Sequence, residues 1–288
     1  MGGKIIVTGS TGFLGGRIVQ YLNAKGFDVV CLKADITNPF AVEIELKENA
    51  GADCLIHLAA TYSDSMIVAH SINTLGTMDL LQTAIRYKVK RFIYFSTCHV
   101  YGKLEGTITE QTVCRPTKPY AITHKCAEDM VLAARDKGEI EGIVLRVSNS
   151  FGMPVNNAKN AWMPIINNMC KQLVETGKIE VKPEAANLER DFITVEDVCR
   201  ATEHFISLDN ERCLDGLFNV GAGFTYTIQD ASDFAEHGTP VVIDSTRKVK
   251  FKYNIRKLLL TDFEYLDNYD KERVDLLTLL NTKHGVLI

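Results

Sequence analysis

Residues 4–16, KIIVTGSTGFLGG, decide the fold of this chain. The run Lys4–Thr8 is rich in apolar and β-branched residues, and three glycines follow it with GxxGxxG spacing, at Gly9, Gly12 and Gly15. Such a run predicts a buried strand, and the glycines allow a tight turn into a helix. The helix N-terminus offers free N–H groups and a partial positive charge, which suit a pyrophosphate. The stretch therefore predicts a strand, a turn and a helix that bind a nucleotide.

The rest of the first half repeats this alternation of strand and helix. Apolar runs that predict strands lie at 28–32, 54–58, 91–96 and 142–147, and helical patterns lie at 12–25, 40–48, 65–88 and 120–137. Apolar strands separated by helices predict a parallel sheet covered on both faces, with ligands beyond the carboxyl ends of the strands. A glycine turn alone is weak evidence of nucleotide binding, but on the first turn of such a sheet it is strong evidence.

The pattern changes after Gly152. A stretch with proline and asparagine, residues 153–164, leads into smaller helical and strand-like pieces. We therefore expect an α/β protein in two parts: a Rossmann-like, doubly wound parallel sheet in residues 1–150 and a smaller C-terminal α+β domain in residues 151–288. Part of residues 190–222 is expected to return to the first domain.

Composition narrows the classes of protein. The chain has 288 residues, 46% hydrophobic and 24% charged, which is typical of one or two globular domains. A net charge of −4 provides no basic field for nucleic acid or anionic lipid, and no apolar run approaches the roughly 18 residues of a membrane span. The early strand leaves no room for a signal peptide. Eight scattered cysteines without CxxC, and histidines without HxxxH or HExxH, predict reduced thiols, no metal site and a cytoplasmic protein.

Eight motifs carry a family resemblance. In chain order they are GSTGFLGG (9–16), CLIHLAA (54–60), NTLGTMDLL (73–81), FSTCHVYG (95–102), PYAITHK (119–125), LRVSNSFG (145–152), RDFITVEDV (190–198) and FNVGAG (218–223). The chain resembles the extended short-chain dehydrogenases/reductases, and among them the NAD-dependent sugar-nucleotide epimerases and dehydratases. The resemblance covers roughly residues 4–235, and the last 50 residues match poorly. It implies a nicotinamide dinucleotide as cofactor and a nucleotide-linked sugar as substrate, bound by the C-terminal domain.

The resemblance also implies a homodimer. In the family, the helices that correspond to 65–88 and 120–137 pair across a two-fold axis. Both stretches carry apolar residues at helical spacing: Met66, Ala69, Leu80, Ala127, Met130, Val131 and Ala134. Packing inside one subunit is the alternative explanation for the same residues.

Cofactor-binding residues follow from the motifs of the family. They are Gly9, Thr11, Gly12, Phe13, Leu14, Gly15, Lys33, Asp35, Ile36, Leu58, Ala59, Ala60, Asn73, Tyr120 and His124. An acidic residue at the end of the second strand favours NAD, and a basic one favours NADP. By distance from the glycines Asp35 suits the acidic role, whereas the family alignment puts Lys33 at the strand end and Asp35 beside the adenine. NAD and NADP therefore both stay open, and Lys33 is either a phosphate contact or a solvated lysine.

The resemblance places catalysis at Thr97, Tyr120 and His124. Tyr120 is expected to take the proton of a sugar hydroxyl while hydride passes to the nicotinamide, with Thr97 holding the same oxygen. The family motif YxxxK has lysine four residues after the tyrosine, where this chain has His124, and Lys125 follows. A helix turns about 100° per residue, so His124 shares a face with Tyr120 and Lys125 lies about 140° away. A histidine with a pKa near its ordinary value of about 6.5 is mostly neutral at pH 7 and would activate the tyrosine less. The alternative for Tyr120 is an ordinary aromatic at a helix start.

The substrate side is less complete. Dehydratases of the family carry Asp and Glu where this chain has Cys98 and His99, which favours epimerisation or simple oxidation and reduction over dehydration. His99 either faces substrate or is a satisfied polar residue. Asn149 matches an asparagine that contacts the diphosphate, and Arg190 matches an arginine that holds a phosphate, with a surface ion pair as its alternative. Arg247 is a candidate second phosphate arginine.

Two hypotheses remain. The first is an NAD(P)-dependent oxidoreductase or epimerase that acts on a nucleotide-linked sugar. The second is a non-catalytic NAD(P)-binding regulatory or scaffold protein of the same fold, suggested by His124 and by a shortened loop after the second strand. Retention of Thr97, Tyr120, Asn149 and Arg190 together favours the enzyme.

Overall fold

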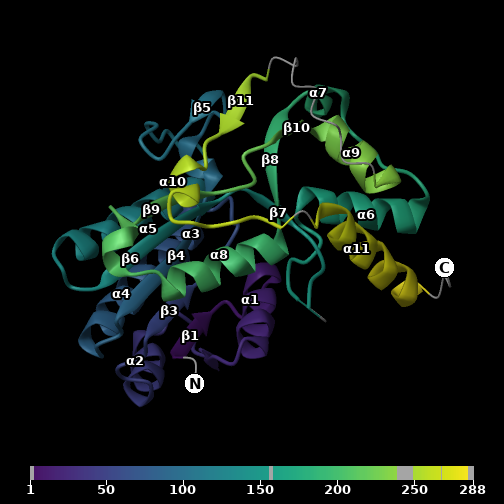
Figure 1. Ribbon diagram of the computed structural model, residues 1–288. Helices are drawn as coiled ribbons and strands as arrows, with labels where there is room; N and C mark the ends of the chain where they lie inside the picture. The colour runs from purple at the N-terminus through teal and green to yellow at the C-terminus, as the bar shows by residue number, and fades with distance from the viewer. Residues whose placement is uncertain (1–2, 156–157, 239–248, 267, 285–288) are drawn as a thin grey trace.

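A parallel six-stranded sheet forms the centre of the molecule (Figure 1). The computed structural model describes residues 3–155, 158–238, 249–266 and 268–284. Its sheet has the order β2-β1-β3-β4-β6-β9, and every pairing is parallel. The strands are β1 (Lys4–Thr8), β2 (Asp28–Cys31), β3 (Cys54–His57), β4 (Arg91–Thr97), β6 (Glu141–Val147) and β9 (Leu217–Val220). The order reverses between β1 and β3, so the chain has the expected doubly wound sheet, and β9 returns to it from a distant part of the sequence.

Helices cover both faces of this sheet because its strand residues alternate between two apolar clusters. Ile5 and Val7 pack with α1 (Phe13–Ala24) and α8 (Val195–Ser207), which contact each other, whereas Ile6 packs toward the opposite face. That opposite face is covered by α2 (Pro39–Glu48), α4 (Thr77–Arg86) and α5 (Pro119–Asp136). Each fully buried Ile, Val or Leu contributes roughly 1.5–3 kcal/mol to folding, so period-two alternation fixes the register of the sheet.

The stretch 65–88 is not the single regular helix that its pattern predicts. It consists of α3 (Met66–Ala69), a π-helical segment η1 (His70–Gly76) and α4. Within η1 the side chain of Asn73 is held by hydrogen bonds from outside the helix, and the Thr77 hydroxyl donates to the Asn73 carbonyl at 2.8 Å. Side-chain contacts across the fold therefore produce the wider turn, which periodicity cannot reveal.

Smaller elements stand beyond the carboxyl ends of the main strands. A three-stranded sheet has the order β10-β8-β7, and β5 pairs with β11. These strands are β5 (Gly106–Ile108), β7 (Asn149–Phe151), β8 (Glu189–Thr194), β10 (Thr225–Thr227) and β11 (Phe251–Tyr253). Three of the short helices are η2 (Cys98–Tyr101), α7 (Pro183–Ala186) and α10 (Arg256–Leu259), and a fourth, η3 (Asn210–Cys213), precedes the amino end of β9. Phe151 and Phe192 pack with α6 (Ile165–Thr176), α9 (Ile228–His237) and α11 (Tyr269–His284), which lie together on the right of Figure 1. The division into domains near residue 150 stays a prediction.

All eight cysteines are free thiols. In the described part of the chain, no helix has both the length and the apolar character to cross a membrane. The same residues contain no group of three or more His, Cys, Asp or Glu side chains arranged to hold a metal ion.

Candidate active site

A cavity of about 500 Å³ opens where the strand order reverses, beyond β1 and β3. This is the position at which doubly wound sheets bind their ligands. Most of the expected cofactor residues line it: Gly9, Thr11, Gly12, Phe13, Leu14, Gly15, Asp35, Ile36, Leu58, Ala59, Ala60, Tyr120 and His124. Two expected residues, Lys33 and Asn73, are not among the lining residues.

The glycine turn forms the floor of this cavity. Gly9 has a φ of +67°, and a Cβ there would lie 2.7 Å from the backbone nitrogen of Ala59. A Cβ on Gly15 would lie 2.2 Å from the carbonyl oxygen of Gly9, so the backbone at both positions excludes a side chain. Gly12 differs, because its nearest neighbour would be the Gly9 oxygen at 3.3 Å. The first turn of α1 has no acidic residue and no side-chain cap, which leaves its N–H groups available to an anion.

The end of β2 brings Asp35 to the cavity. The Asp35 carboxylate accepts hydrogen bonds from the backbone nitrogen and the hydroxyl of Thr37, at 2.9 and 2.8 Å, and these bonds lower its pKa. The side chain of Lys33 is exposed, and its backbone nitrogen donates to the Glu45 carboxylate at 2.9 Å. Of the two candidates for the adenosine ribose, the structure places Asp35 in the cavity wall and Lys33 outside it.

Asn73 supports the cavity from behind. Its side-chain oxygen accepts from the Thr61 nitrogen at 2.8 Å, and its amide donates to the Thr61 carbonyl and the Thr123 hydroxyl, both at 3.0 Å. These bonds fix the loop after β3 and join η1 to α5, and the Asn73 side chain is only 1% exposed. Asn73 therefore shapes the cavity wall without forming part of its surface.

Tyr120 lies at the start of α5, on the cavity wall. Its half-buried ring packs against His124, with centroids 4.4 Å apart and planes at 65°, and against Tyr62 at 4.8 Å. Burial, and then Cys98, raise the pKa of Tyr120 to about 12, while a hydrogen bond with the Thr97 side chain opposes the shift. Tyr120 is therefore protonated at neutral pH and has Thr97 nearby. Thr97 itself is not among the residues that line the cavity.

His124 is buried, and its two ring nitrogens differ. Nδ1 lies 2.7 Å from the Tyr94 hydroxyl, whereas Nε2 has no hydrogen-bond partner in the described part of the chain. Burial, and then the charge of His99, lower the pKa of His124 to about 3, so the ring is neutral at pH 7. An unsatisfied buried nitrogen costs roughly 1–3 kcal/mol, and a ligand hydroxyl in the cavity that this ring lines would remove that cost. The site therefore fits a nicotinamide dinucleotide on two counts: the glycine cradle and this nitrogen.

Lys125 lies apart from this arrangement. Its ammonium group pairs with Asp129, one turn further along α5. Lys125 is not among the residues that line the cavity. The family's lysine charge is therefore replaced here by a neutral imidazole.

The expected substrate residues gather beside Thr97 and outside the cavity lining. The backbone nitrogen of His99 donates to the Thr97 hydroxyl at 3.2 Å. The surrounding protein, and then the charges of Arg190 and Lys118, lower the pKa of His99, although its side chain is exposed. Arg190 therefore lies near His99.

Arg190 keeps most of its donors unused. Its guanidinium donates to the Glu189 carbonyl at 2.7 Å, and in the described residues it makes no ion pair with a carboxylate. The Asn149 amide donates to the Asp191 carbonyl at 2.9 Å, which ties Asn149 to the strand that carries Arg190. Arg247 lies outside the described residues.

Cys98 and His99 provide no carboxylic acid. Burial is the main cause that raises the pKa of Cys98 to about 12, so its side chain stays a neutral thiol at pH 7. A dehydratase needs a group that protonates a leaving hydroxyl, and neither side chain supplies one here.

One wall of the cavity consists of residues that carry no motif in the sequence. Lys159, Asn160 and Met163 line it, from the stretch that follows β7. The Lys159 nitrogen donates to the Thr11 carbonyl at 2.9 Å, and its exposed side chain adds a cation beside the glycine turn. In the sequence this stretch has the proline and asparagine of a linker, and only the fold brings it to the first turn.

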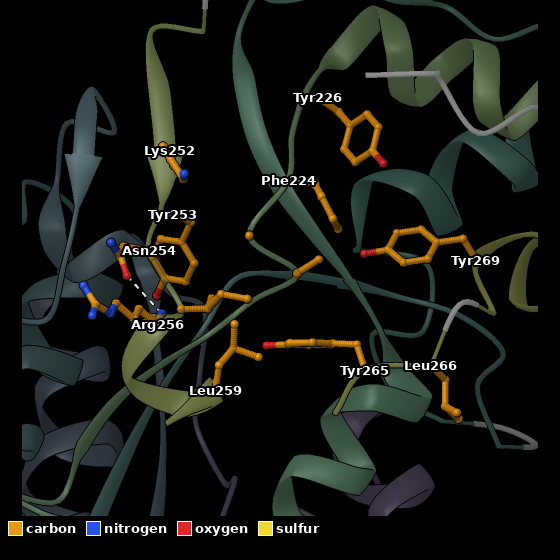
Figure 2. A pocket seen from close by; sticks show the side chains of 13 residues that line it. Phe224, Tyr226, Lys252, Tyr253, Asn254, Arg256, Leu259, Tyr265, Leu266 and Tyr269 are labelled. Atoms are coloured by element: carbon orange, nitrogen blue, oxygen red, sulfur yellow. Dashed lines mark hydrogen bonds between the residues drawn. The ribbon is translucent and has the colours of Figure 1, made fainter. Parts of the chain in front are cut away.

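A second, larger cavity of about 870 Å³ lies away from these residues (Figure 2). Figure 2 shows the side chains of Phe224, Tyr226, Tyr253, Tyr265 and Tyr269 around it, with Lys252 on the opposite wall from Tyr226. The hydroxyls of Tyr253 and Tyr269 are bonded to main-chain carbonyls, of Arg146 at 2.7 Å and of Phe192 at 2.8 Å. No expected catalytic, cofactor or substrate residue lines this cavity, so the smaller cavity is the candidate active site despite its size.

Known proteins share this sequence pattern and fold. Residues 5–221 match the model of the NAD dependent epimerase/dehydratase family. GDP-6-deoxy-D-talose 4-dehydrogenase of Aggregatibacter actinomycetemcomitans is 31% identical over 242 residues, which cover 78% of this chain and 76% of that protein. Among solved structures, RMD from Pseudomonas aeruginosa complexed with NADPH has a TM-score of 0.81 at 22% identity, covering 98% and 99% of the two chains. UDP-glucose 4-epimerase of Thermus thermophilus, in complex with NAD, has a TM-score of 0.74 at 20% identity, covering 95% and 98%.

Proposed function

This chain belongs to the NAD dependent epimerase/dehydratase family, and we propose that it is an NAD(P)-dependent oxidoreductase or epimerase of a nucleotide-linked sugar. The observation that carries the proposal is that Tyr120 lines a cavity whose floor is the glycine turn, with the Thr97 side chain close enough to affect the pKa of its phenol. A hydroxyl and a phenol that converge beside a nicotinamide site are the side chains that alcohol oxidation requires. The relatives support the substrate class, since one is named for a GDP-linked deoxysugar and another for UDP-glucose.

Each part of the cavity has a proposed binding role. The glycine turn and the N-terminus of α1 hold the pyrophosphate, and Asp35 accepts from the adenosine ribose. The free Nε2 of His124 meets the ribose on the nicotinamide side. When bound, the nicotinamide accepts or returns a hydride. Arg190, with donors unused by any carboxylate of the described residues, binds a phosphate of the substrate.

Proton transfer falls to Tyr120. Its Oη takes the proton of the sugar hydroxyl whose carbon is oxidised and gives it back on reduction, while Thr97 holds that oxygen in place. With a pKa of about 12, the phenolate fraction at pH 7 is on the order of 10⁻⁵, and the neutral His124 adds no charge to increase it. We therefore expect slow turnover at neutral pH that rises by up to about tenfold per pH unit.

Reaction type follows from what the site lacks. Without carboxylic acids at Cys98 and His99, epimerisation or simple oxidation and reduction fits better than dehydration. The regulatory or scaffold alternative draws its support from the neutral His124. The two hypotheses differ in turnover, not in cofactor binding.

A homodimer is also proposed, through a surface that differs from the expected one. Ala69, Leu80, Ala127, Val131 and Ala134 are buried inside the subunit, which is the alternative noted for them. Of the expected residues Met66 is exposed, and the other exposed apolar residues of α3 and η1 are Ile67, Val68 and Leu75. A two-fold axis through this face would bury them.

The decisive experiment combines released cofactor with turnover. The purified protein is denatured, and the released nucleotide is identified by mass spectrometry. Oxidation of GDP- and UDP-linked sugars is followed by nicotinamide absorbance, and their epimerisation, which leaves no net change in the nicotinamide, is followed by proton NMR of the sugar. We expect bound NAD(P) and measurable turnover. Tyr120→Phe should lose at least about 100-fold in rate and keep the cofactor, because only the proton acceptor is removed. Tyr87→Phe, which removes a hydroxyl bonded to Glu43 far from the cavity, is the matched control.

Two outcomes would contradict the proposal. If no nucleotide is released and none binds when added, the dinucleotide site is wrong. If NAD(P) is bound but wild type and Tyr120→Phe are equally inert on every sugar nucleotide at pH 7 and pH 9.5, the scaffold alternative holds.

A further inference from the structure

We infer that Tyr94 is a positioning residue for His124, which it fixes as the neutral tautomer with hydrogen on Nε2, the ring nitrogen that has no partner among the described residues. The role toward the cofactor rests on the proposed function, whereas the tautomer itself depends on this chain alone. The inference assigns a role to a buried strand residue outside the motifs that identify the site. It also accounts for the unpartnered nitrogen of His124.

Both side chains are held rigidly. Tyr94 lies in β4, between β3 and β6 in the sheet, and is 2% exposed. His124 is also 2% exposed, on the face of α5 that packs against β4. The Tyr94 hydroxyl and His124 Nδ1 are 2.7 Å apart, and the ring planes meet at 35° with centroids 5.7 Å apart. Since neither residue has room to change rotamer freely, this hydrogen bond sets the orientation of the imidazole.

The position of the proton follows from counting donors and acceptors. Burial raises the pKa of Tyr94 well above its ordinary value, so the phenol keeps its proton and is a donor. In the described residues its one hydrogen-bond partner is His124 Nδ1. An imidazole nitrogen accepts only when it carries no hydrogen, so the ring hydrogen of the neutral histidine is on Nε2.

The opposite tautomer is costlier. If Nδ1 carried the hydrogen and donated to Tyr94, the phenol hydrogen and Nε2 would both be buried without partners. In the observed geometry the Nδ1–H tautomer therefore has two unsatisfied groups, whereas the Nε2–H tautomer has one. The Nδ1–H tautomer is less stable by roughly 1–3 kcal/mol. At that cost the Nδ1–H form is a minor species.

The ring of His124 lines the cavity, and the fixed tautomer puts its hydrogen on Nε2, which is buried in the cofactor-free protein. Nε2–H can donate to a hydroxyl oxygen of a ribose, which reproduces the hydrogen bond of the family's lysine and omits its charge. The titratable groups around the ring are Tyr94 on β4, Tyr120 on α5, His57 on β3 and His99 on η2. No carboxylate is among the groups that shift its pKa, so nothing there favours a second proton on the imidazole.

Nitrogen NMR of the cofactor-free protein tests the tautomer directly. The ring nitrogens of ¹⁵N-histidine-labelled protein are assigned by the signal that is lost in His124→Asn. We expect one neutral Nε2–H tautomer for His124, unchanged from pH 8 to pH 5. In Tyr94→Phe we expect mixed tautomers and NAD(P) binding weakened about 3- to 10-fold in calorimetry, which corresponds to the loss of one hydrogen bond.

Tyr253→Phe is the matched control. Tyr253 is equally buried and its hydroxyl also donates at 2.7 Å, to the Arg146 carbonyl, away from the cavity. Tyr253→Phe should lower the free energy of unfolding about as much as Tyr94→Phe does. It should leave both the His124 tautomer and the NAD(P) affinity unchanged.

Several results would separate the possibilities. A wild-type Nδ1–H tautomer overturns the inference, and this spectrum suffices even if Tyr94→Phe does not fold. The inference is also overturned if Tyr94→Phe folds and, like the control, changes neither the His124 tautomer nor the NAD(P) affinity. If the Nε2–H tautomer is present but no dinucleotide binds, the proposed function fails while the positioning of His124 by Tyr94 stands.

Discussion

Gly12 and Lys159 form an isolated parallel β-bridge that joins the glycine turn to the segment after β7. The Lys159 nitrogen also donates to the carbonyl of Thr11, the residue before Gly12. Two distant parts of the sequence thus build one wall of the cavity, and the backbone at Gly12 faces both. Any side chain at this position has to share the space with whatever the cavity holds.

Gly12→Val is expected to abolish dinucleotide binding without unfolding the sheet. The backbone of Gly12, at φ −81°, is one that valine adopts, and its Cβ has one near neighbour at 3.3 Å. The added methyl groups would therefore enter the space meant for a pyrophosphate. Calorimetric titration measures binding and circular dichroism checks the fold, with Gly12→Ala as a graded control that should bind more weakly than wild type. Wild-type affinity in Gly12→Val would refute the glycine-turn assignment.

Lys33→Asp is expected to leave the preference between NAD and NADP unchanged, since the side chain lies outside the cavity lining.

Asp35→Asn should weaken NAD binding about 3- to 10-fold, because a charged acceptor for ribose hydroxyls becomes a neutral amide. The ratio of the two dissociation constants is the measurement for both variants. A shift of tenfold or more toward NAD in Lys33→Asp would show that Lys33 reaches the 2′ position.

His124→Lys is expected to keep cofactor binding and to raise turnover at pH 7. A positive charge against the Tyr120 ring lowers the pKa of the phenol from about 12, and a shift of one to two units corresponds to roughly 10- to 100-fold in rate. The pH–rate profile should move to lower pH by the same amount. Lys125→Ala, whose ammonium pairs with Asp129, should be nearly silent. If Lys125→Ala loses most of the turnover and His124→Ala keeps it, Lys125 rather than His124 activates Tyr120.

Acid should destabilise the protein from about pH 6.5 downward. Burial lowers the pKa of both His57 and His124 to about 3, against about 6.5 in an unfolded chain. Between these values the unfolded state binds more protons than the folded state. The free energy of unfolding therefore decreases as the pH decreases, by up to about 1.4 kcal/mol per pH unit for each histidine. Urea unfolding at pH 7.5, 6 and 5 measures the slope. His124→Gln should reduce it, and His237→Gln, at an exposed histidine, should not. A flat profile would contradict the burial of these rings.

Ile67→Glu is expected to convert a dimer into a monomer. Ile67 is 80% exposed at the centre of the apolar surface of α3. Light scattering at micromolar concentration should give twice the chain mass of 32.1 kDa for wild type and the single mass for the variant. Ile44→Glu, at an isoleucine of α2 that is 62% exposed, is the matched control and should stay dimeric. A monomeric wild type would end the dimer proposal.

The sequence predicted those features that depend on neighbouring residues. β1 begins and ends at the expected residues because its signal is one uninterrupted run of residues, buried from Ile5 to Thr8. The glycine turn was predictable for the same reason, since its spacing, strand and helix are contiguous. The position of His124 beside Tyr120 follows from helix geometry over four residues.

Features that depend on contacts across the fold could not be predicted. The π-helical turn at Asn73 requires bonds to Thr61 and Thr123, which are distant in sequence. Whether Lys33 or Asp35 reaches the cavity depends on how the chain leaves β2, and both residues fit the sequence pattern equally. Lys159 has no sequence signal of its own, because a lysine in a polar stretch is most often solvated.

The late return of β9 affects how the protein is made. β6 ends at residue 147 and its outer partner β9 begins at residue 217, so the ribosome adds 69 residues between them, which takes about 3–14 s at typical rates. During translation β6 is therefore an unpaired edge with apolar residues on both faces, able to pair with a neighbouring nascent chain. Polysomes would bring such edges close together. We therefore expect co-expression of a chaperone that covers nascent chains to raise the yield of folded protein.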